Sequence, residues 1–195
     1  MRLFFAVIPT PEIRAGLASA AAALGVCREA RLVRVENYHM TIAFAGKVSR
    51  EQASALRAAG AAVRCPSFEV TLDAYEYWQK PEVAVAVARD CPAALLELHH
   101  ALRAHFDRLG LPADPSVFRA HVTLARKVAQ PPVVKAMSRL SLAVRHFELV
   151  RSGRSAEGSV YTVVDSWPLL DNAGAAHKSL KFERICAERQ TLVVK

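Results

Sequence analysis

The chain has 195 residues, a length that suits one domain or one domain with two tightly packed lobes. Hydrophobic residues make up 52% of it and charged residues 23%, which predicts a sizeable core and excludes disorder over the whole chain. Lys and Arg outnumber Asp and Glu by 26 to 18, and this basic balance favours anionic partners (nucleic acid, nucleotides or an acidic membrane face) or a merely solvated surface.

The first elements are a strand and a helix. Residues 2–8 are dense in Leu, Phe and Val, which predicts a buried strand that ends at a proline. Thr10 and Pro11 have the order of a helix N-cap and a first helical residue. The Ala-rich segment that follows is predicted to be helical up to Leu24, with Gly25 as its stop.

The middle of the chain alternates between short apolar runs and one capped helix. Ser49 and Gln52 fit a capping box, which predicts a helix over 49–63. Alternation of apolar and polar residues, or of Val with Ala, is typical of strands. Strands are therefore expected over 40–45, 68–73 and 83–88.

The second half begins with a helix that carries one apolar stripe. Pro92 opens it, and four leucines and a phenylalanine follow at spacings of three and four up to residue 109. Pro131 and Pro132 are expected to start another short helix. Strands are expected over 121–126, 144–150 and 159–167, the last two joined as a hairpin through Gly153 and Gly158.

This order contains too many adjacent strands for an alternating βα protein. We expect an α+β fold with largely antiparallel sheets and helices outside them. A helix followed by a strand bearing His-x-Thr occurs at residue 39 and again 82 residues later, which indicates two related lobes within residues 1–170. Residues 171–195 show no clean periodicity and are treated as a C-terminal appendage of unknown order.

The start of the chain is too short an apolar run for a signal peptide, and no apolar run approaches the roughly 20 residues that span a bilayer. The four cysteines form no Cys-x-x-Cys pair, so free thiols in a cytoplasmic protein are expected. They are Cys27, Cys65, Cys91 and Cys186.

Two matched tetrapeptides carry the functional hypothesis: His39-Met40-Thr41-Ile42 and His121-Val122-Thr123-Leu124. Alternate residues of a strand share a face, so each His shares a face with its Thr, while the apolar residues point into a core. The alternative interpretation is two partly buried histidines satisfied by neighbouring hydroxyls.

A pair of imidazoles suits attack of water on a strained phosphodiester. One neutral ring takes a proton from water, the other gives a proton to the leaving oxygen, and the hydroxyls of Thr41 and Thr123 stabilise the phosphoryl charge. No metal or cofactor is needed for this scheme. Arg126 could hold the phosphate, but it has the wrong parity from His121 and reaches the site only if the strand twists, bulges or ends there.

Four blocks extend the pattern beyond the motifs. They are residues 2–7 (RLFFAV), 37–46 (NYHMTIAFAG), 118–126 (FRAHVTLAR), and 158–164 with the following Trp-Pro-Leu at 167–169. In these blocks the chain resembles the 2H phosphoesterases, and within them the bacterial and archaeal RNA 2′,3′-cyclic phosphodiesterases, also described as 2′-5′ RNA ligases. The resemblance covers nearly all of residues 1–170.

The resemblance implies two pseudo-symmetric lobes with a catalytic cleft between them. It implies metal-independent hydrolysis of RNA 2′,3′-cyclic ends to 2′-phosphomonoesters, with His39 as proton donor and His121 as proton acceptor. Thr41, Thr123 and Arg126 map to phosphate-binding positions; the residues alone do not decide which His is the acid. Ala120 stands where many relatives have proline, and nothing carries over to residues 171–195.

The alternatives are a cyclic phosphodiesterase for small nucleotides or 2′-5′ oligonucleotides, and an RNA-end-binding module without turnover. Reverse 2′-5′ joining of RNA uses the same groups. No obligate protein partner is implied. Four other histidines are set aside as surface or packing residues: His99, His100, His105 and His146. Three aromatic residues could pack in the core or stack on a base: Phe5, Tyr38 and Phe118. Three arginines could form a solvated face or steer RNA: Arg28, Arg31 and Arg34.

Overall fold

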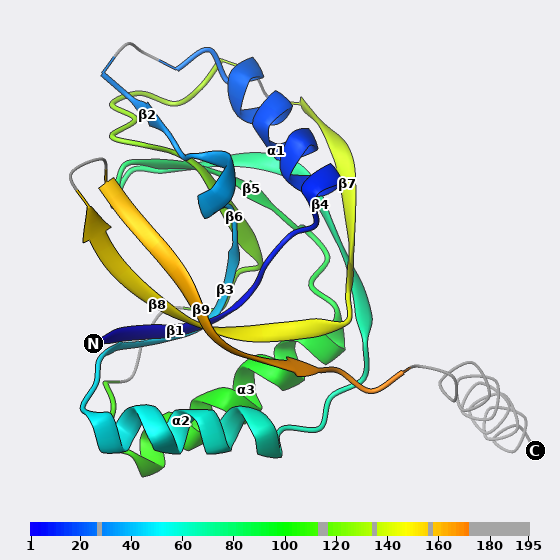
Figure 1. Ribbon diagram of the computed structural model, residues 1–195. Helices are drawn as coiled ribbons and strands as arrows, with labels where there is room; N and C mark the ends of the chain where they lie inside the picture. The colour runs from blue at the N-terminus through cyan, green and yellow to red at the C-terminus, as the bar shows by residue number, and fades with distance from the viewer. Residues whose placement is uncertain (27–28, 113–116, 134–135, 156–157, 172–195) are drawn as a thin grey trace, which may run out of the picture.

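Two antiparallel sheets lie against each other and carry the helices on their outer sides (Figure 1). The computed structural model describes residues 1–26, 29–112, 117–133, 136–155 and 158–171. Sheet A has the strand order β3-β1-β8-β9 and sheet B the order β2-β6-β5-β4-β7. The expected α+β class with largely antiparallel sheets is confirmed.

The elements have the following bounds. Sheet A contains β1 (Arg2–Val7), β3 (Met40–Lys47), β8 (His146–Ser155) and β9 (Gly158–Pro168). Sheet B contains β2 (Arg31–Leu32), β4 (Phe68–Trp78), β5 (Val83–Val87), β6 (His121–Arg126) and β7 (Ala136–Val144). The helices are α1 (Pro11–Ala23), α2 (Arg50–Ala62) and α3 (Ala93–Arg108), with a single 3-10 turn η1 (Val35–Asn37).

The helices begin where their capping residues predict. The Thr10 hydroxyl accepts from the backbone of α1, and Ser49 and Gln52 form a reciprocal capping box on α2. Helix α3 turns its apolar stripe inward, and the stripe residues Leu95, Leu98, Leu102 and Phe106 are all buried.

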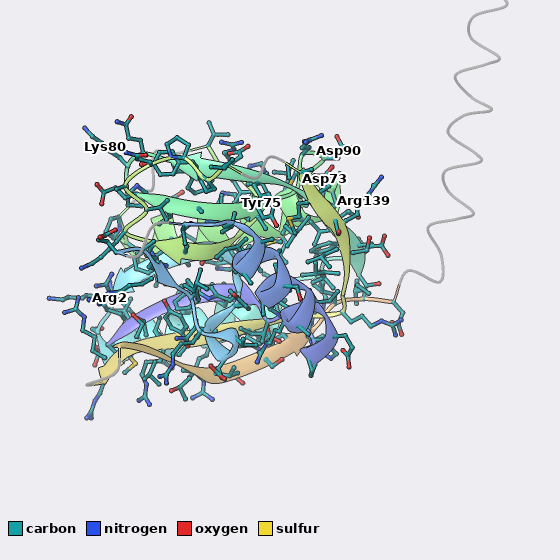
Figure 2. All side chains as sticks on the ribbon, turned by 90° about the horizontal axis from the view of Figure 1, so that it is seen from above. Arg2, Asp73, Tyr75, Lys80, Asp90 and Arg139 are labelled. Atoms are coloured by element: carbon teal, nitrogen blue, oxygen red, sulfur yellow. The ribbon has the colours of Figure 1, made fainter. Side chains whose placement is uncertain are left out.

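Helix α1 packs against sheet B, whereas α2 and α3 pack against sheet A (Figure 1). The Tyr75 hydroxyl of β4 donates to the Ala20 carbonyl of α1 at 2.9 Å, and Figure 2 places Tyr75 beside this helix. Because each sheet has its outer face covered by helix, its inner face is left to build a site.

The two lobes are not the two halves of the chain. Sheet A combines β1 and β3 with β8 and β9 from the C-terminal part, and the chain enters sheet B in between. The motif strands β3 and β6 lie in different sheets and contact each other. The duplication seen in the sequence therefore reflects two similar strands in an interleaved fold.

Three local expectations were wrong. Residues 131–133 are not helical, and β7 follows where a short helix was expected after Pro131-Pro132. The strand expected over 144–150 is broken at Arg145, where the chain leaves sheet B and enters sheet A. Strand β4 continues to Trp78, five residues beyond the alternating segment that predicted it.

The β8–β9 hairpin is confirmed, with Ser155 paired to Gly158. At the end of the described chain, the Leu170 N–H donates to the Cys65 carbonyl at 2.9 Å. Of the cysteines, Cys65 and Cys91 are free thiols, whereas Cys27 and Cys186 lie outside the described residues. The predicted appendage at 171–195 also lies outside them, except for its first residue. No helix in the described ranges is long and apolar enough to span a membrane.

Candidate active site

The two motif histidines are held in the same way, one from each sheet. His39 immediately precedes β3 and His121 opens β6. The Nδ1 of each ring lies 2.7 Å from the carbonyl oxygen of the residue two positions earlier, Asn37 for the first and Arg119 for the second. A carbonyl only accepts, so each Nδ1 carries a proton and the Nε2 of each neutral ring is left as the nitrogen that can accept one.

The four residues at the apolar positions of the motifs are buried, as the strand pattern predicts, and they are Met40, Ile42, Val122 and Leu124. Thr41 and Thr123 are partly exposed and alternate with them. Each threonine therefore lies on the same face of its strand as the histidine before it, although Thr41 alone lines a cavity.

A β-bulge in β6 brings Arg126 to the site face. Val85 pairs with Thr123 and Ala84 with Ala125, which leaves Leu124 as an extra residue in β6. Leu124 and Ala125 are consecutive buried residues, so the parity of the strand changes and Arg126 faces the same side as His121. The parity problem in the sequence is thus resolved by the bulge.

Strand β3 has the same bulge at the same distance from its histidine. Ala6 pairs with Thr41 and Phe5 with Ala43, which leaves Ile42 as the extra residue. The residue that this bulge turns outward is Phe44, whose side chain is 42% exposed, unusual for a phenylalanine. One motif therefore presents a cation and the other presents an aromatic ring at the equivalent position.

Two adjoining cavities meet at Thr41 and Phe44, which line both. The larger, about 640 Å³, contains His39 and Arg126. The smaller, about 320 Å³, contains His121. The other described residues of the larger cavity are polar or basic apart from two aromatic rings and a glycine: Arg2, Phe4, Ser152, Gly153, Arg154, Ser159 and Tyr161. The smaller is mostly apolar, with Ile42, Ala43, Trp78, His99, Arg103, Val117, Phe118 and Arg119.

Aromatic rings fix both imidazoles. His39 lies between Phe4 and Tyr161, with ring centroids 5.0 and 4.8 Å away. The Trp78 ring lies 4.5 Å from that of His121. These contacts restrict the orientation of each ring beyond the single Nδ1 hydrogen bond.

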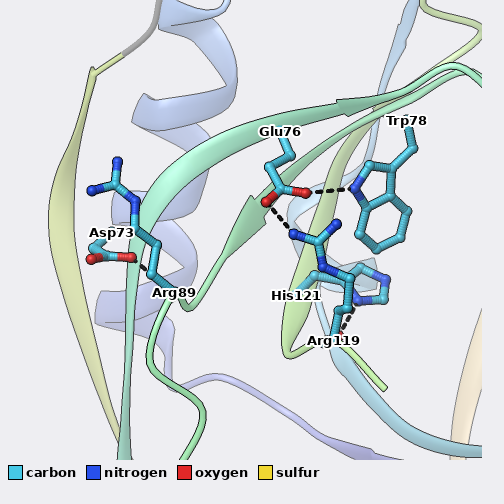
Figure 3. Close-up of polar contacts among 6 residues, drawn as sticks. All are labelled: Asp73, Glu76, Trp78, Arg89, Arg119 and His121. Carbon is cyan, nitrogen blue, oxygen red and sulfur yellow. Dashed lines mark hydrogen bonds and ion pairs between the residues drawn. The ribbon is translucent and has the colours of Figure 1, made fainter. Parts of the chain in front are cut away.

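A polar cluster supports the His121 side, as Figure 3 shows. The Trp78 indole N–H donates to one oxygen of Glu76 at 2.8 Å, and the Arg119 guanidinium forms an ion pair with the other. The Arg119 guanidinium also lies 5.6 Å from the Trp78 ring centroid. The residue whose carbonyl orients His121 is itself held in place by this cluster.

The electrostatics favour neutral imidazoles in the free protein. Burial lowers the pKa of His39, and the positive charges of Arg126 and His121 lower it further, against the Asn37 carbonyl. Burial also lowers the pKa of His121, with Arg119 and Arg126 acting in the same direction and the Arg119 carbonyl and Glu76 opposing it. Arg126 lowers the pKa of both histidines, and His121 also lowers that of His39, so the three residues share one electrostatic site.

Several residues of the site had no signal in the sequence. Phe44 and Trp78 were not singled out, because the bulge and the long β4 are tertiary features. His99 was set aside, yet its Nδ1 lies 2.6 Å from the Ile42 carbonyl at the bulge, and its ring stacks on Phe118 at 4.4 Å. Phe118 lines the cavity, whereas Phe5 and Tyr38 are core residues.

Of the arginines considered for RNA steering, Arg31 pairs directly with Arg126 across β2 and β6. Arg34 is exposed, and Arg28 lies outside the described residues. Arg31 therefore adds a second positive charge beside Arg126 at the edge of sheet B.

Comparison with known proteins gives a consistent result. The family model described as the 2′-5′ RNA ligase superfamily matches residues 3–156. The RNA 2′,3′-cyclic phosphodiesterase of Escherichia coli (strain K12) is 31% identical over 169 residues, which cover 86% of this chain and 96% of the relative. A protein of the same description from Thermus thermophilus is 32% identical over 187 residues, 89% of this chain and 93% of the relative.

Among solved structures, E. coli LigT complexed with 3′-AMP superposes with a TM-score of 0.81 at 31% identity, covering 86% of this chain and 97% of that one. LigT complexed with phosphate gives a TM-score of 0.77 at 32% identity, covering 87% and 97%.

Proposed function

The chain belongs to the 2′-5′ RNA ligase superfamily, and we propose that it hydrolyses 2′,3′-cyclic phosphodiester ends of RNA to 2′-phosphomonoesters. The observation that carries the proposal is the pair of imidazoles from two sheets. Each is fixed through Nδ1, and the charge of Arg126 lowers the pKa of each. The E. coli and Thermus thermophilus relatives, both RNA 2′,3′-cyclic phosphodiesterases, support the same activity.

In this mechanism the cyclic phosphate lies between the two Nε2 atoms. The neutral ring of His121 takes the proton of the attacking water, and the protonated ring of His39 gives a proton to the leaving 3′ oxygen. The assignment of base and acid follows the family resemblance. The Nδ1 hydrogen bonds keep both rings oriented throughout, because each carbonyl accepts the same N–H in the neutral and the charged ring.

The phosphoryl oxygens need donors as negative charge develops on them. We assign this role to the hydroxyls of Thr41 and Thr123 and the guanidinium of Arg126, and the strand register that turns them to the site faces supports the assignment. These side chains supply acid, base and charge stabilisation without a metal ion. We therefore expect turnover to continue in EDTA.

The apolar cavity beside His121 is suited to a nucleobase. Its walls include the rings of Phe44, Trp78 and Phe118, with Arg119 at its edge. Aromatic rings and guanidinium planes stack on bases without regard to sequence. This arrangement favours a terminal nucleotide of any base as the substrate.

The first test removes each imidazole in turn. We expect His39→Ala and His121→Ala each to lower kcat/KM for a nucleoside 2′,3′-cyclic phosphate by at least about 10³-fold, because each loses a general acid or base. His146→Ala is the matched control, since His146 is exposed at the start of β8 and lines neither cavity. Circular dichroism checks that all three variants fold. Near wild-type turnover in either motif variant rejects the mechanism, and binding of RNA ends without any turnover by the wild type rejects the activity.

A further inference from the structure

The inner face of sheet A extends beyond His39. It carries two arginines that the proposed reaction does not use. Arg2 lies at the start of β1 and Arg154 near the end of β8, and both line the outer part of the larger cavity. Both side chains are exposed, and Figure 2 shows Arg2 extending outward from the end of the sheet.

Strand register places these arginines on one surface. Arg2 pairs with Ser152 across β1 and β8, and Arg154 pairs with Ser159 across β8 and β9. Because alternate residues of a strand share a face, Ser152 and Arg154 point to the same side. The Asn37 amide, which donates to the Ser159 carbonyl at 2.9 Å, links this surface to the turn that orients His39.

The positive charge of this surface favours binding of an anion. The described residues that line the larger cavity include three arginines, Arg2, Arg126 and Arg154, and no Asp or Glu. Guanidinium groups gathered without a counter-charge repel one another, and a bound anion relieves that repulsion. Arg2 is also held in position, because its guanidinium lies 5.5 Å from the Phe44 ring centroid.

The chemistry of the substrate identifies the anion. A nucleotide that ends an RNA chain in a cyclic phosphate has one other phosphodiester, attached to its 5′ carbon. With the base in the apolar cavity and the cyclic phosphate at Arg126, the polar cavity remains for that second phosphate. We propose that Arg2 and Arg154 form a second phosphate subsite, which binds this 5′-phosphodiester and makes RNA ends better substrates than cyclic mononucleotides. The inference rests on the proposed function.

The test compares three substrates that differ only at the 5′ position. They are a nucleoside 2′,3′-cyclic phosphate, the same nucleotide with a 5′-phosphate, and a dinucleotide with the same cyclic end. We expect kcat/KM to be about tenfold higher for the second and third substrates than for the first, since each adds one charge-assisted contact. Arg154→Gln should remove most of this gain while it changes kcat/KM for the first substrate less than about twofold.

Arg151→Gln is the matched control, because Arg151 is exposed one residue from Ser152 on the same strand, so its side chain points to the opposite face of sheet A. The proposal predicts an unchanged preference in this variant. A gain for the dinucleotide alone, or an equal loss in both arginine variants, overturns the subsite and leaves the proposed function intact.

A binding measurement separates the two hypotheses further. Fluorescence anisotropy of an oligoribonucleotide ending in a 2′-phosphate, measured over a range of NaCl concentrations, needs no turnover. The slope of log Kd against log [NaCl] should fall by about 0.7 in Arg154→Gln, the value for one phosphate contact on a single strand. Such a change in a protein that hydrolyses none of the three substrates supports the subsite and rejects the proposed function. An unchanged slope rejects the subsite.

Discussion

At the scale of single residues, the motif histidines are distinguished by what surrounds them rather than by how they are held. Both use Nδ1 to bind a carbonyl 2.7 Å away. His39 packs between two aromatic rings, whereas His121 has Trp78 and, through Arg119, the carboxylate of Glu76 nearby. Only His121 therefore has an acidic group that raises its pKa, which opposes the effect of burial there.

The lowered pKa values of both histidines predict an acidic pH optimum. The proposed mechanism needs one ring neutral and the other protonated, so kcat/KM should rise through the pKa of the base and fall through the pKa of the acid. Because both pKa values lie below the ordinary 6.5, the maximum of kcat/KM should lie below pH 6.5. Above it, kcat/KM should fall about tenfold per pH unit. A pH–rate profile with a cyclic nucleotide measures this directly.

Arg126 provides the control for that profile. Its charge lowers the pKa of both histidines, so Arg126→Gln should move the optimum to higher pH as well as lower kcat/KM by about 100-fold. Arg126→Lys keeps the charge and should keep the optimum, although it loses the planar fork that we propose binds phosphate. If the glutamine variant loses activity but keeps the wild-type optimum, Arg126 acts on the phosphate alone.

At the scale of elements, close packing between α2 and β9 determines where the C-terminal strand lies. Gly60 faces Trp167, and a Cβ at that position would lie 2.6 Å from the indole ring. Trp167 in turn packs against Phe5 and Phe147 of the core below the site. The glycine is therefore needed for contact with a rigid ring, although it lies inside a helix, where glycine is ordinarily unfavourable.

We expect Gly60→Ala to lower the free energy of unfolding by about 1–3 kcal/mol, because the overlap with Trp167 outweighs the better helix propensity of alanine. Gly16→Ala in α1 is the matched control. Its Cβ would meet the end of the partly exposed Leu140 side chain, with the nearer methyl group at 2.7 Å, and that side chain can rotate. Urea denaturation of both variants tests the contrast, and equal effects of the two substitutions would contradict it.

The elements themselves were largely predictable, because capping residues and hydrophobic periodicity are local. Thr10, Ser49 and Gln52 marked the starts of two helices correctly. The motif histidines, His39 and His121, were also predictable from the sequence, because two copies of His-x-Thr on predicted strands are an uncommon pattern. The bulges that bring Phe44 and Arg126 to the site were not predictable, because they depend on pairing with β1 and β5, which are distant in sequence.

At the scale of the whole molecule, the topology explains why the lobes could not be assigned from the sequence. The duplicated motif indicated two related lobes, but the chain crosses between the sheets several times, including at Arg145. Strand β3 therefore lies in the same sheet as the β8–β9 hairpin, and β6 lies in the same sheet as β4 and β5. The relative position of the two histidines is therefore set by the complete fold.

The whole fold also buries one carboxyl group that the proposed chemistry does not use. Glu148 lies on β8 between Ala6 and Ser166, and its Oε2 atom is buried with no hydrogen-bond partner among the described residues. Burial raises the pKa of Glu148 to about 7, against a hydrogen bond from the Ile8 backbone. The native state thus holds a proton there that the unfolded chain releases near its ordinary pKa of 4.5.

This carboxyl group stabilises the native state more in mild acid than at neutral pH, whereas the lowered pKa values of His39 and His121 act in the opposite direction. Between pH 4.5 and about 7 the Glu148 carboxyl binds more protons in the native state than in the unfolded state, so its contribution to the free energy of unfolding falls as pH rises through this window. The expected loss in the free energy of unfolding from Glu148 is only about 1–2 kcal/mol, because partial exposure to solvent screens the charge of this carboxylate. Glu148→Gln should remove this contribution and stabilise the protein above pH 7. Glu69→Gln, at an exposed position on β4, should leave it unchanged. Urea denaturation at pH 5 and pH 8 tests this for the three proteins. The change in the free energy of unfolding from pH 5 to pH 8 should be more positive in Glu148→Gln than in the wild type, and an equal change in the two proteins would contradict the prediction.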